Sequence, residues 1–141
     1  MKKTIIIFYI FIFTICFQSM VLASVSEEKI TASDGADLDY FGSSVAISGD
    51  YAIVSAHEDD DNGSRSGSAY IFQRSGESWS QQEKLTASDG ADGDRFGSSV
   101  AISGDYAIIC ARGDDDNGSA SGSAYIFHRS GESWSQQEKI T

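Results

Sequence analysis

Carboxylates recur in short loops of this sequence, where they could hold a divalent cation. Each of two loops carries three aspartates within six residues, and all six are kept although their neighbours differ between the loops. Carboxylates this close repel one another unless a cation or hydrogen-bond donors compensate. Oxygen ligands suit Ca²⁺, so the loops predict calcium sites completed by carbonyls and water, unless Asp and Gly serve only as turn formers. The six residues are Asp34, Asp37, Asp39, Asp89, Asp92 and Asp94.

A second acidic segment offers a weaker calcium candidate. Glu58, Asp60 and Asn62 place oxygen ligands at alternate positions before Gly63, as in the first half of a calcium loop. The position that should supply a closing bidentate carboxylate is Ala69. This segment therefore predicts an incomplete site.

Three short motifs carry possible surface chemistry. Asn62 and Asn117 each begin an Asn-Gly-Ser glycosylation sequon, although Asn-Gly is also a strong hairpin turn signal. Residues 112–114 spell Arg-Gly-Asp, a tripeptide that integrins recognise, but it occurs in one copy only. Trp79 and Trp134 could stack on sugars or pack at a sheet edge.

The sequence shows no set of residues typical of an active site. His57 and His128 do not occupy equivalent positions in the two copies. No nucleophile elbow, phosphate-binding loop, dinucleotide fingerprint or zinc spacing is present. We therefore expect a non-enzymatic protein, with calcium as the one candidate cofactor.

The N-terminus and the charge predict an exported acidic protein. Lys2 and Lys3 precede an apolar run over 5–17, and small residues end at Ala23, as in a signal peptide cleaved there. The alternative is an uncleaved anchor, for which the apolar run is short.

The formal net charge of the 141 residues is −11, which argues against nucleic acid and anionic membranes as partners. Cys110 is left without an internal disulfide partner after cleavage.

The chain repeats itself at a spacing of 55 residues, and each copy contains four β-prone runs. In the first copy they cover 40–48, 51–56, 68–74 and 79–86, separated by Gly-rich turns. Apolar residues do not recur at helical spacing. The inner runs are apolar on both faces, so each sheet needs a neighbour stacked on it. The pattern predicts an all-β fold of two four-stranded antiparallel β-propeller-type blades plus one extra N-terminal strand, a partial propeller.

These residues resemble a known family. Phe41-Gly42 before the first hairpin, with the runs at 54–57 and 67–72, is similar to the FG-GAP repeat of integrin α chains and many extracellular proteins. The resemblance implies a β-propeller fold and says almost nothing about activity, because one fold hosts many functions. It is closest to a divergent branch opening with Asp-Gly-Ala-x-x-Asp-x-Phe-Gly, present at 34–42. The family's calcium loop between its first two strands is missing, because 48–51 is only a tight turn.

The predicted organisation leaves the propeller incomplete. Residues 1–23 are the expected signal peptide, 24–33 an orphan strand of a preceding blade, 34–86 the first repeat and 87–141 the second. Propellers close with about 4–8 blades, so two blades leave apolar faces uncovered. A homo-oligomer could complete the ring, or the chain could be a fragment of a longer protein.

Export, repeats and the lack of catalytic groups together predict a secreted, non-enzymatic interaction or adhesion module. Its expected partner is an extracellular protein or a glycan. The alternatives are a structural fragment of a larger exoprotein, or scaffold blades of an extracellular hydrolase whose active site lies elsewhere.

Overall fold

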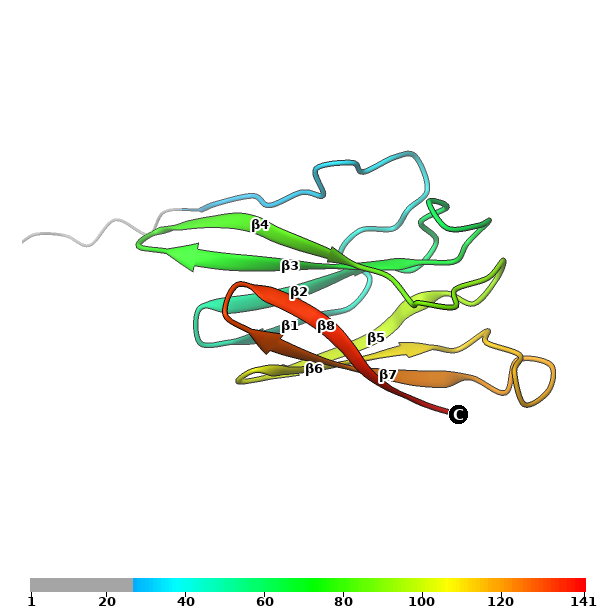
Figure 1. The fold of residues 1–141 in the computed structure, drawn as a ribbon. Helices are drawn as coiled ribbons and strands as arrows, with labels where there is room; N and C mark the ends of the chain where they lie inside the picture. The colour runs from blue at the N-terminus through cyan, green and yellow to red at the C-terminus, as the bar shows by residue number, and fades with distance from the viewer. Residues whose placement is uncertain (1–26) are drawn as a thin grey trace, which may run out of the picture.

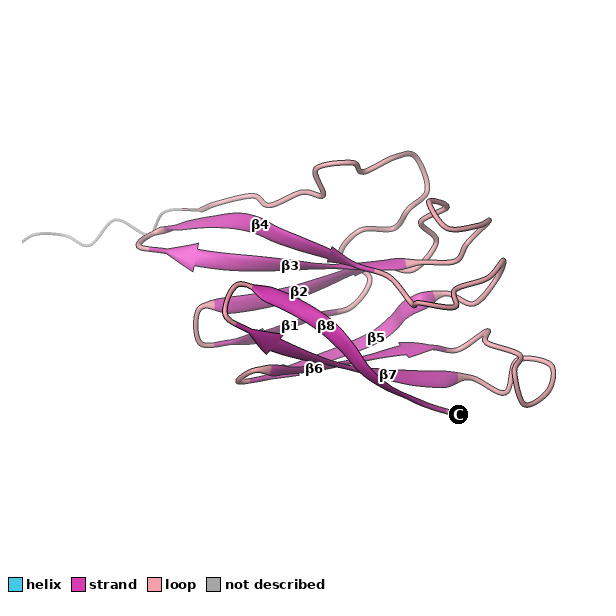
Figure 2. Cartoon of the chain, in the orientation of Figure 1, coloured by secondary structure: helices cyan, strands magenta, loops and turns pink. Residues whose placement is uncertain are grey.

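A computed structural model describes residues 27–141, so the predicted signal peptide and its cleavage site lie outside the described residues. The described chain forms eight strands and no helix, and therefore no helix able to cross a bilayer (Figure 2). The strands are β1 (Val45–Ser48), β2 (Tyr51–Ala56), β3 (Ser68–Ser75), β4 (Ser78–Leu85), β5 (Phe96–Ser103), β6 (Tyr106–Ala111), β7 (Ser123–Ser130) and β8 (Ser133–Ile140).

The strands form two antiparallel sheets, each with its strands in sequence order (Figure 1). We call β1 to β4 blade 1 and β5 to β8 blade 2. Tight turns join β1 to β2 and β3 to β4, where Gly49 and Gly76 adopt positive φ angles of 59° and 65° that suit glycine. The predicted all-β fold with two four-stranded blades is confirmed.

The main hydrophobic core lies between the two sheets. Ile53 and Ile71 of blade 1 are fully buried in one cluster with Phe96, Ile109 and Tyr125 of blade 2. Alternate residues of the same blade 1 strands point to the opposite face, where Val54 and Tyr70 belong to a separate cluster. Both faces of the inner strands are thus apolar, which is why one sheet cannot remain alone.

One octapeptide, Phe-Gly-Ser-Ser-Val-Ala-Ile-Ser, occurs in both blades with different structures. At 96–103 all eight residues form β5, whereas at 41–48 only the last four form β1. The amide of Phe96 donates to Ser66 O of blade 1 at 2.8 Å, and the amide of Val100 donates to Ser44 Oγ at 3.1 Å. The contact with a preceding blade therefore accompanies the longer strand.

No strand is assigned to residues 27–33, the described part of the predicted orphan strand. The segment nevertheless lies beside β4 (Figure 1), where the amide of Trp79 donates to Glu28 Oε2 at 3.0 Å. The amide of Trp134 donates to Glu83 Oε2 of β4 in the same way at 2.9 Å. Segment 27–33 thus occupies against blade 1 the place that the end of β4 occupies against blade 2. It has no strand of its own blade to pair with among the described residues, so it remains irregular.

Candidate functional site

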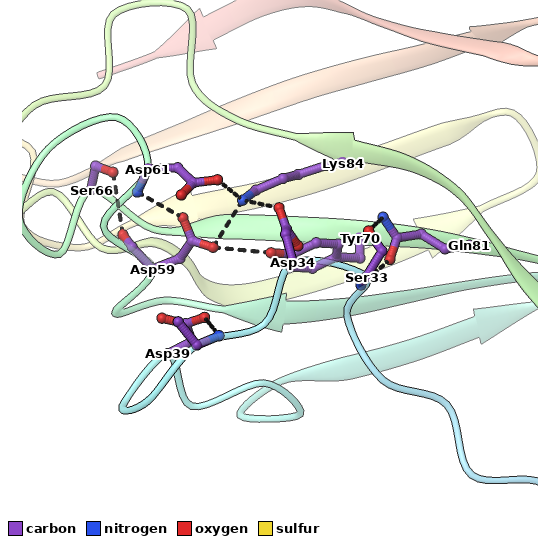
Figure 3. A network of polar contacts seen from close by, with 10 residues as sticks. Ser33, Asp34, Asp39, Asp59, Asp61, Ser66, Tyr70, Gln81 and Lys84 are labelled. Carbon is purple, nitrogen blue, oxygen red and sulfur yellow. Dashed lines mark hydrogen bonds and ion pairs between the residues drawn. The ribbon is translucent and has the colours of Figure 1, made fainter.

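The densest polar cluster of blade 1 surrounds the ammonium group of Lys84 (Figure 3). Lys84 Nζ lies 2.8 Å from Asp34 Oδ2 and 3.0 Å from Asp59 Oδ2, and it also contacts Asp61. The hydroxyl of Tyr70 donates to Asp59 Oδ2 at 3.0 Å. Lysine therefore supplies the positive charge that three neighbouring carboxylates require.

The strands and the loops bring these residues together from distant positions in the sequence. Tyr70 and Lys84 face each other across the β3–β4 pair, and Nζ lies 5.3 Å from the centre of the tyrosine ring. The loop after β2 contributes Asp59, which accepts from the amide of Asp61 at 3.1 Å and is 3% exposed. The cluster ties both loops to the edge of the sheet.

Blade 2 repeats the cluster around Lys139. Its Nζ lies 2.8 Å from Asp89 Oδ2, 2.7 Å from Asp114 Oδ2 and 2.6 Å from Asp116 Oδ2. The hydroxyl of Tyr125 lies 3.0 Å from both Asp89 and Asp114. Because both repeats contain the same arrangement, we infer that it is a structural feature of the repeat rather than a chance surface contact.

The surroundings of Lys84 and Asp34 keep both groups charged at neutral pH. Burial alone would oppose the charge of Lys84, but its hydrogen bonds to Asp34, Asp61 and Asp59 raise its pKa above the ordinary value. The hydrogen bond from Lys84 holds the pKa of Asp34 below its ordinary value. Burial, together with the neighbouring carboxylates, raises the pKa of Tyr70. None of these shifts moves a pKa towards neutrality, as proton transfer at pH 7 would need.

The structure separates the three carboxylates of the first predicted calcium loop. Asp34 pairs with Lys84, whereas Asp39 is buried and accepts from the amide of Ala36 in its own loop at 2.6 Å. Asp37 is exposed. In blade 2, Asp89 and Asp94 repeat these roles, and Asp92 accepts from the amide of Ser64 across the blade interface at 2.9 Å.

The second predicted calcium set is also divided. Glu58 Oε1 lies 3.0 Å from Arg95 Nε of blade 2, and Asp60 Oδ1 accepts from the amide of Arg65 at 2.6 Å. Asn62 is exposed in a turn. Within residues 27–141, no three His, Cys, Asp or Glu side chains are grouped so that they could hold a metal ion. Calcium binding stays a prediction.

An open groove lies beside the acidic loops of blade 1. It is lined by two exposed apolar side chains, three carboxylates, one serine and one arginine. Leu38 is 76% exposed and Tyr40 is 60% exposed, so both offer apolar surface to a ligand. We call this feature the acidic groove; its lining residues are Asp37, Leu38, Tyr40, Glu58, Asp60, Ser64 and Arg65.

The remaining sequence motifs have distinct positions in the fold. Asn62 and Asn117 are both exposed in turns, so either position could accept a glycan. Asp114 is 2% exposed and bonded to Lys139, so the Arg-Gly-Asp tripeptide does not present its aspartate to a receptor. Trp134 is buried against Tyr51 with ring centres 6.1 Å apart, which favours the packing role over sugar stacking.

Sequence reasoning missed the lysines and tyrosines of the two clusters. Lys84 and Tyr70 return unchanged as Lys139 and Tyr125, so the repeat itself held the signal. The calcium hypothesis looked for carboxylates close in sequence. Strand pairing instead brings the ammonium group of Lys84 to Asp34, the first of these carboxylates, from 50 residues away along the chain.

Comparison with known proteins agrees with this architecture. The sequence model of the FG-GAP repeat matches residues 25–72 and 79–127, more than half of the chain. The protein therefore belongs to the FG-GAP repeat family. Each match begins before the first strand of a blade and ends in its third strand, so the family's sequence unit is offset from the sheet. No curated protein matches the chain.

Proposed function

We propose that this chain is an exported, non-enzymatic interaction module that binds a positively charged segment of an extracellular protein through its acidic groove. The groove itself carries the proposal: Leu38 and Tyr40 offer exposed apolar contacts beside Asp37 and Asp60. An apolar and aromatic surface next to carboxylates complements lysine and arginine side chains, which combine an apolar stem with a charged head. Family membership supports a propeller-like interaction role.

The chemistry of the lysine clusters supports a role without catalysis. An acid–base catalyst at neutral pH needs a group with a pKa near 7. The pKa of Lys84 and of Tyr70 is raised, and that of Asp34 and of Asp59 is lowered. Lys84, Asp34 and Asp59 therefore keep their charges at pH 7 and Tyr70 stays neutral, which suits a structural tie. A hydrolase screen on the purified chain should be blank, and turnover abolished by one substitution would contradict this part of the proposal.

Binding by the acidic groove can be tested with a lysine- and arginine-rich peptide as the probe. We expect calorimetry to show binding that weakens as salt concentration rises, because the contact is largely electrostatic. The double variant D37N/D60N should lose most of this affinity, since amides keep the shape of the carboxylates without their charge. The matched control is E77Q in the exposed β3–β4 turn. Equal loss in both variants, or no binding at low salt, would contradict the proposal.

Export is proposed from the N-terminal sequence and has its own test. The chain is expressed with residues 1–23 in a secreting bacterial host. It should appear outside the cytoplasm, and its mass should match that of a chain that starts at Ser24. Replacing Lys2 and Lys3 with glutamate should reduce this export. Full-length protein retained in the cytoplasmic fraction would contradict it.

A further inference from the structure

The packing of blade 2 on blade 1 provides a template for a second interface. On blade 1, the face that meets blade 2 carries Ile53, Ile71 and Leu85, which are 0%, 0% and 3% exposed. Val100 and Tyr125 of blade 2 belong to the core cluster that covers them. This contact is the established way in which one repeat of this chain buries the face of another.

Blade 2 carries the same face without cover among the described residues. Ile108, Ile126 and Ile140 stand where Ile53, Ile71 and Leu85 stand in blade 1. Ile108 is 39% exposed and Ile140 is 47% exposed. An apolar pocket opens on this surface, lined by Ala101, Tyr106, Ile108 and Ile126 among others. We call this surface the blade 2 outer face.

Blade 1 carries the complementary face at the other side of the stack. Val45 and Ile47 are the equivalents of Val100 and Ile102, which pack on blade 1. They pair with Val54 and Ala52 across β1 and β2, so they lie on the same face as these residues. Val45 is 64% exposed and Ile47 is 65% exposed. We call this surface the blade 1 outer face.

We propose that the blade 2 outer face of one copy of this chain binds the blade 1 outer face of a second copy, as blade 2 binds blade 1 within the chain. Continuity with the internal interface carries this proposal. The apolar residues of the two outer faces repeat those of the internal contact, apart from conservative exchanges such as Ile140 for Leu85 and Val54 for Ile109. Isoleucine, leucine and valine side chains are similar in volume and apolar character, so such exchanges are tolerated in a packed interface.

Hydrogen bonds from backbone amides to serine side chains at the internal contact can also be repeated. The amide of Val100 donates to Ser44 Oγ, and the amide of Gly104 donates to Ser48 Oγ at 3.2 Å. Ser99 and Ser103 are the equivalent acceptors on the blade 2 outer face. They would receive the amides of Val45 and Gly49 of the second copy.

The charge difference between the repeats is compatible with this contact. Inside the chain, Arg95 and Glu58 form an ion pair across the blades at 3.0 Å. At the proposed interface the equivalent residues are Tyr40 and Gly113, so both charges of the pair are replaced together. The contact therefore buries no unpaired charge at this point. A buried unpaired charge would weaken the association.

Segment 27–33 competes with the second copy for part of the site. Its Ile30 and Ala32 pack on the cluster around Val54, at the places that Leu85 and Ala87 take against blade 2. In the proposed assembly, Ile140 of the second copy takes the place of Ile30. The segment must therefore leave before the contact is complete, and loosening it should strengthen association.

The contact joins different faces, so each copy keeps one free face for the next copy. Such a head-to-tail interface closes into a ring when the rotation permits it. Propellers of about 4–8 blades correspond to about 2–4 copies of a two-blade chain. Asp37 and Tyr40 of the acidic groove are the equivalents of Asp92 and Arg95, which contact blade 1, so a second copy and a bound peptide compete for this part of blade 1. Peptide binding is therefore measured where the chain is monomeric, and failure of self-association would leave the proposed peptide binding untouched.

Sedimentation of the full chain and two complementary aspartate variants tests the interface. We expect the unaltered chain to form discrete oligomers as its concentration rises. V45D and I108D should each be monomeric, because each loses one face of the contact. An equimolar mixture should form 1:1 dimers, because the intact faces of the two variants still match. A symmetric contact between like faces would give no such complementation, and a mixture that stays monomeric contradicts the proposal.

Additional variants keep the test decisive. I47D and I140D repeat the pair if either first variant loses its melting transition. I30S should loosen segment 27–33 and shift assembly to at least about tenfold lower concentration, an energy change of about 1.4 kcal/mol. An unaltered chain that remains a single protomer at every soluble concentration, with I30S equally monomeric, would overturn the proposal.

Discussion

Gly67 of blade 1 lies directly against the backbone of Phe96 in blade 2. A methyl group placed on Gly67 would stand 2.1 Å from Phe96 O, far inside contact distance. At the equivalent Gly122 of blade 2, the three nearest atoms among the described residues belong to Ala111 and Arg112 of its own blade, and the closest would be 3.7 Å away. Their φ angles are similar at 85° and 78°, so backbone strain is matched and only the contact between blades differs.

This pair gives the first prediction. G122A should cost about 1 kcal/mol of unfolding free energy, because alanine resists positive φ. G67A should cost about 2–4 kcal/mol, because it adds a clash with the neighbouring blade to the same strain. Urea unfolding at a concentration where the chain is monomeric measures both. Equal losses would contradict the packing of β5 on the loop before β3.

The second prediction concerns the two equivalent phenylalanines. Phe96 is fully buried and packs edge-on against Tyr125 at 5.3 Å between ring centres, whereas Phe41 is half-buried against Tyr70 at 5.6 Å. F96A should cost about 3–5 kcal/mol. F41A should cost about 1–2 kcal/mol, because less apolar surface is lost from contact. Thermal melting compares the two variants. A larger loss of stability for F41A would contradict the assignment of the main core to the space between the two blades.

The third prediction is a pH dependence from the Lys84 cluster. The pKa of Asp34 and of Asp59 is lower in the folded protein than the ordinary 3.8. These groups therefore stabilise the fold above about pH 4, and the stabilisation is lost as pH falls through the lowered values. Because the pKa of Lys84 is raised in the folded protein, its charge stabilises the fold below the ordinary pKa of 10.5. This stabilisation is lost as the pH rises above that value through the raised pKa.

Replacing Lys84 should lower the stability of the protein by an amount that depends on pH. K84M leaves buried Asp59 without its cation and should cost about 2–3 kcal/mol at pH 7. The cost should shrink near pH 4, because Asp59 can then bind a proton. K29M removes the same charge from an exposed residue and serves as the control. A cost for K84M that is independent of pH, or equal to that of K29M, would contradict the role assigned to the lysine.

The fourth prediction separates lysine from calcium as the cation at these carboxylates. If Lys84 takes the place of a metal ion, millimolar calcium should raise the melting temperature of K84M more than that of the unaltered chain. The carboxylates of Asp34, Asp59 and Asp61 would then be free to bind it. D37N and D92N test the loop sites predicted from sequence. Calcium stabilisation of the unaltered chain that is abolished by these substitutions would restore the original calcium hypothesis.

The sequence predicted the strands and the two blades well, because apolar runs and glycine turns are local signals. It did not predict which residues would meet across the fold. Lys84 reaches Asp34 only because the β3–β4 pair returns the chain beside the loop before β1. The different lengths of β1 and β5 were equally unpredictable from their identical octapeptides, since a neighbouring blade determines how far each strand extends.

Hydrogen exchange at the two identical octapeptides is the most direct test of the central claim, that each blade needs a stacked neighbour to order its face. The intrinsic exchange rates of 41–48 and 96–103 are nearly matched because their residues are the same. At concentrations where the chain is monomeric, the amides of Phe96 and Val100 should exchange at least about tenfold more slowly than those of Phe41 and Val45. Equal exchange at both octapeptides would contradict the account.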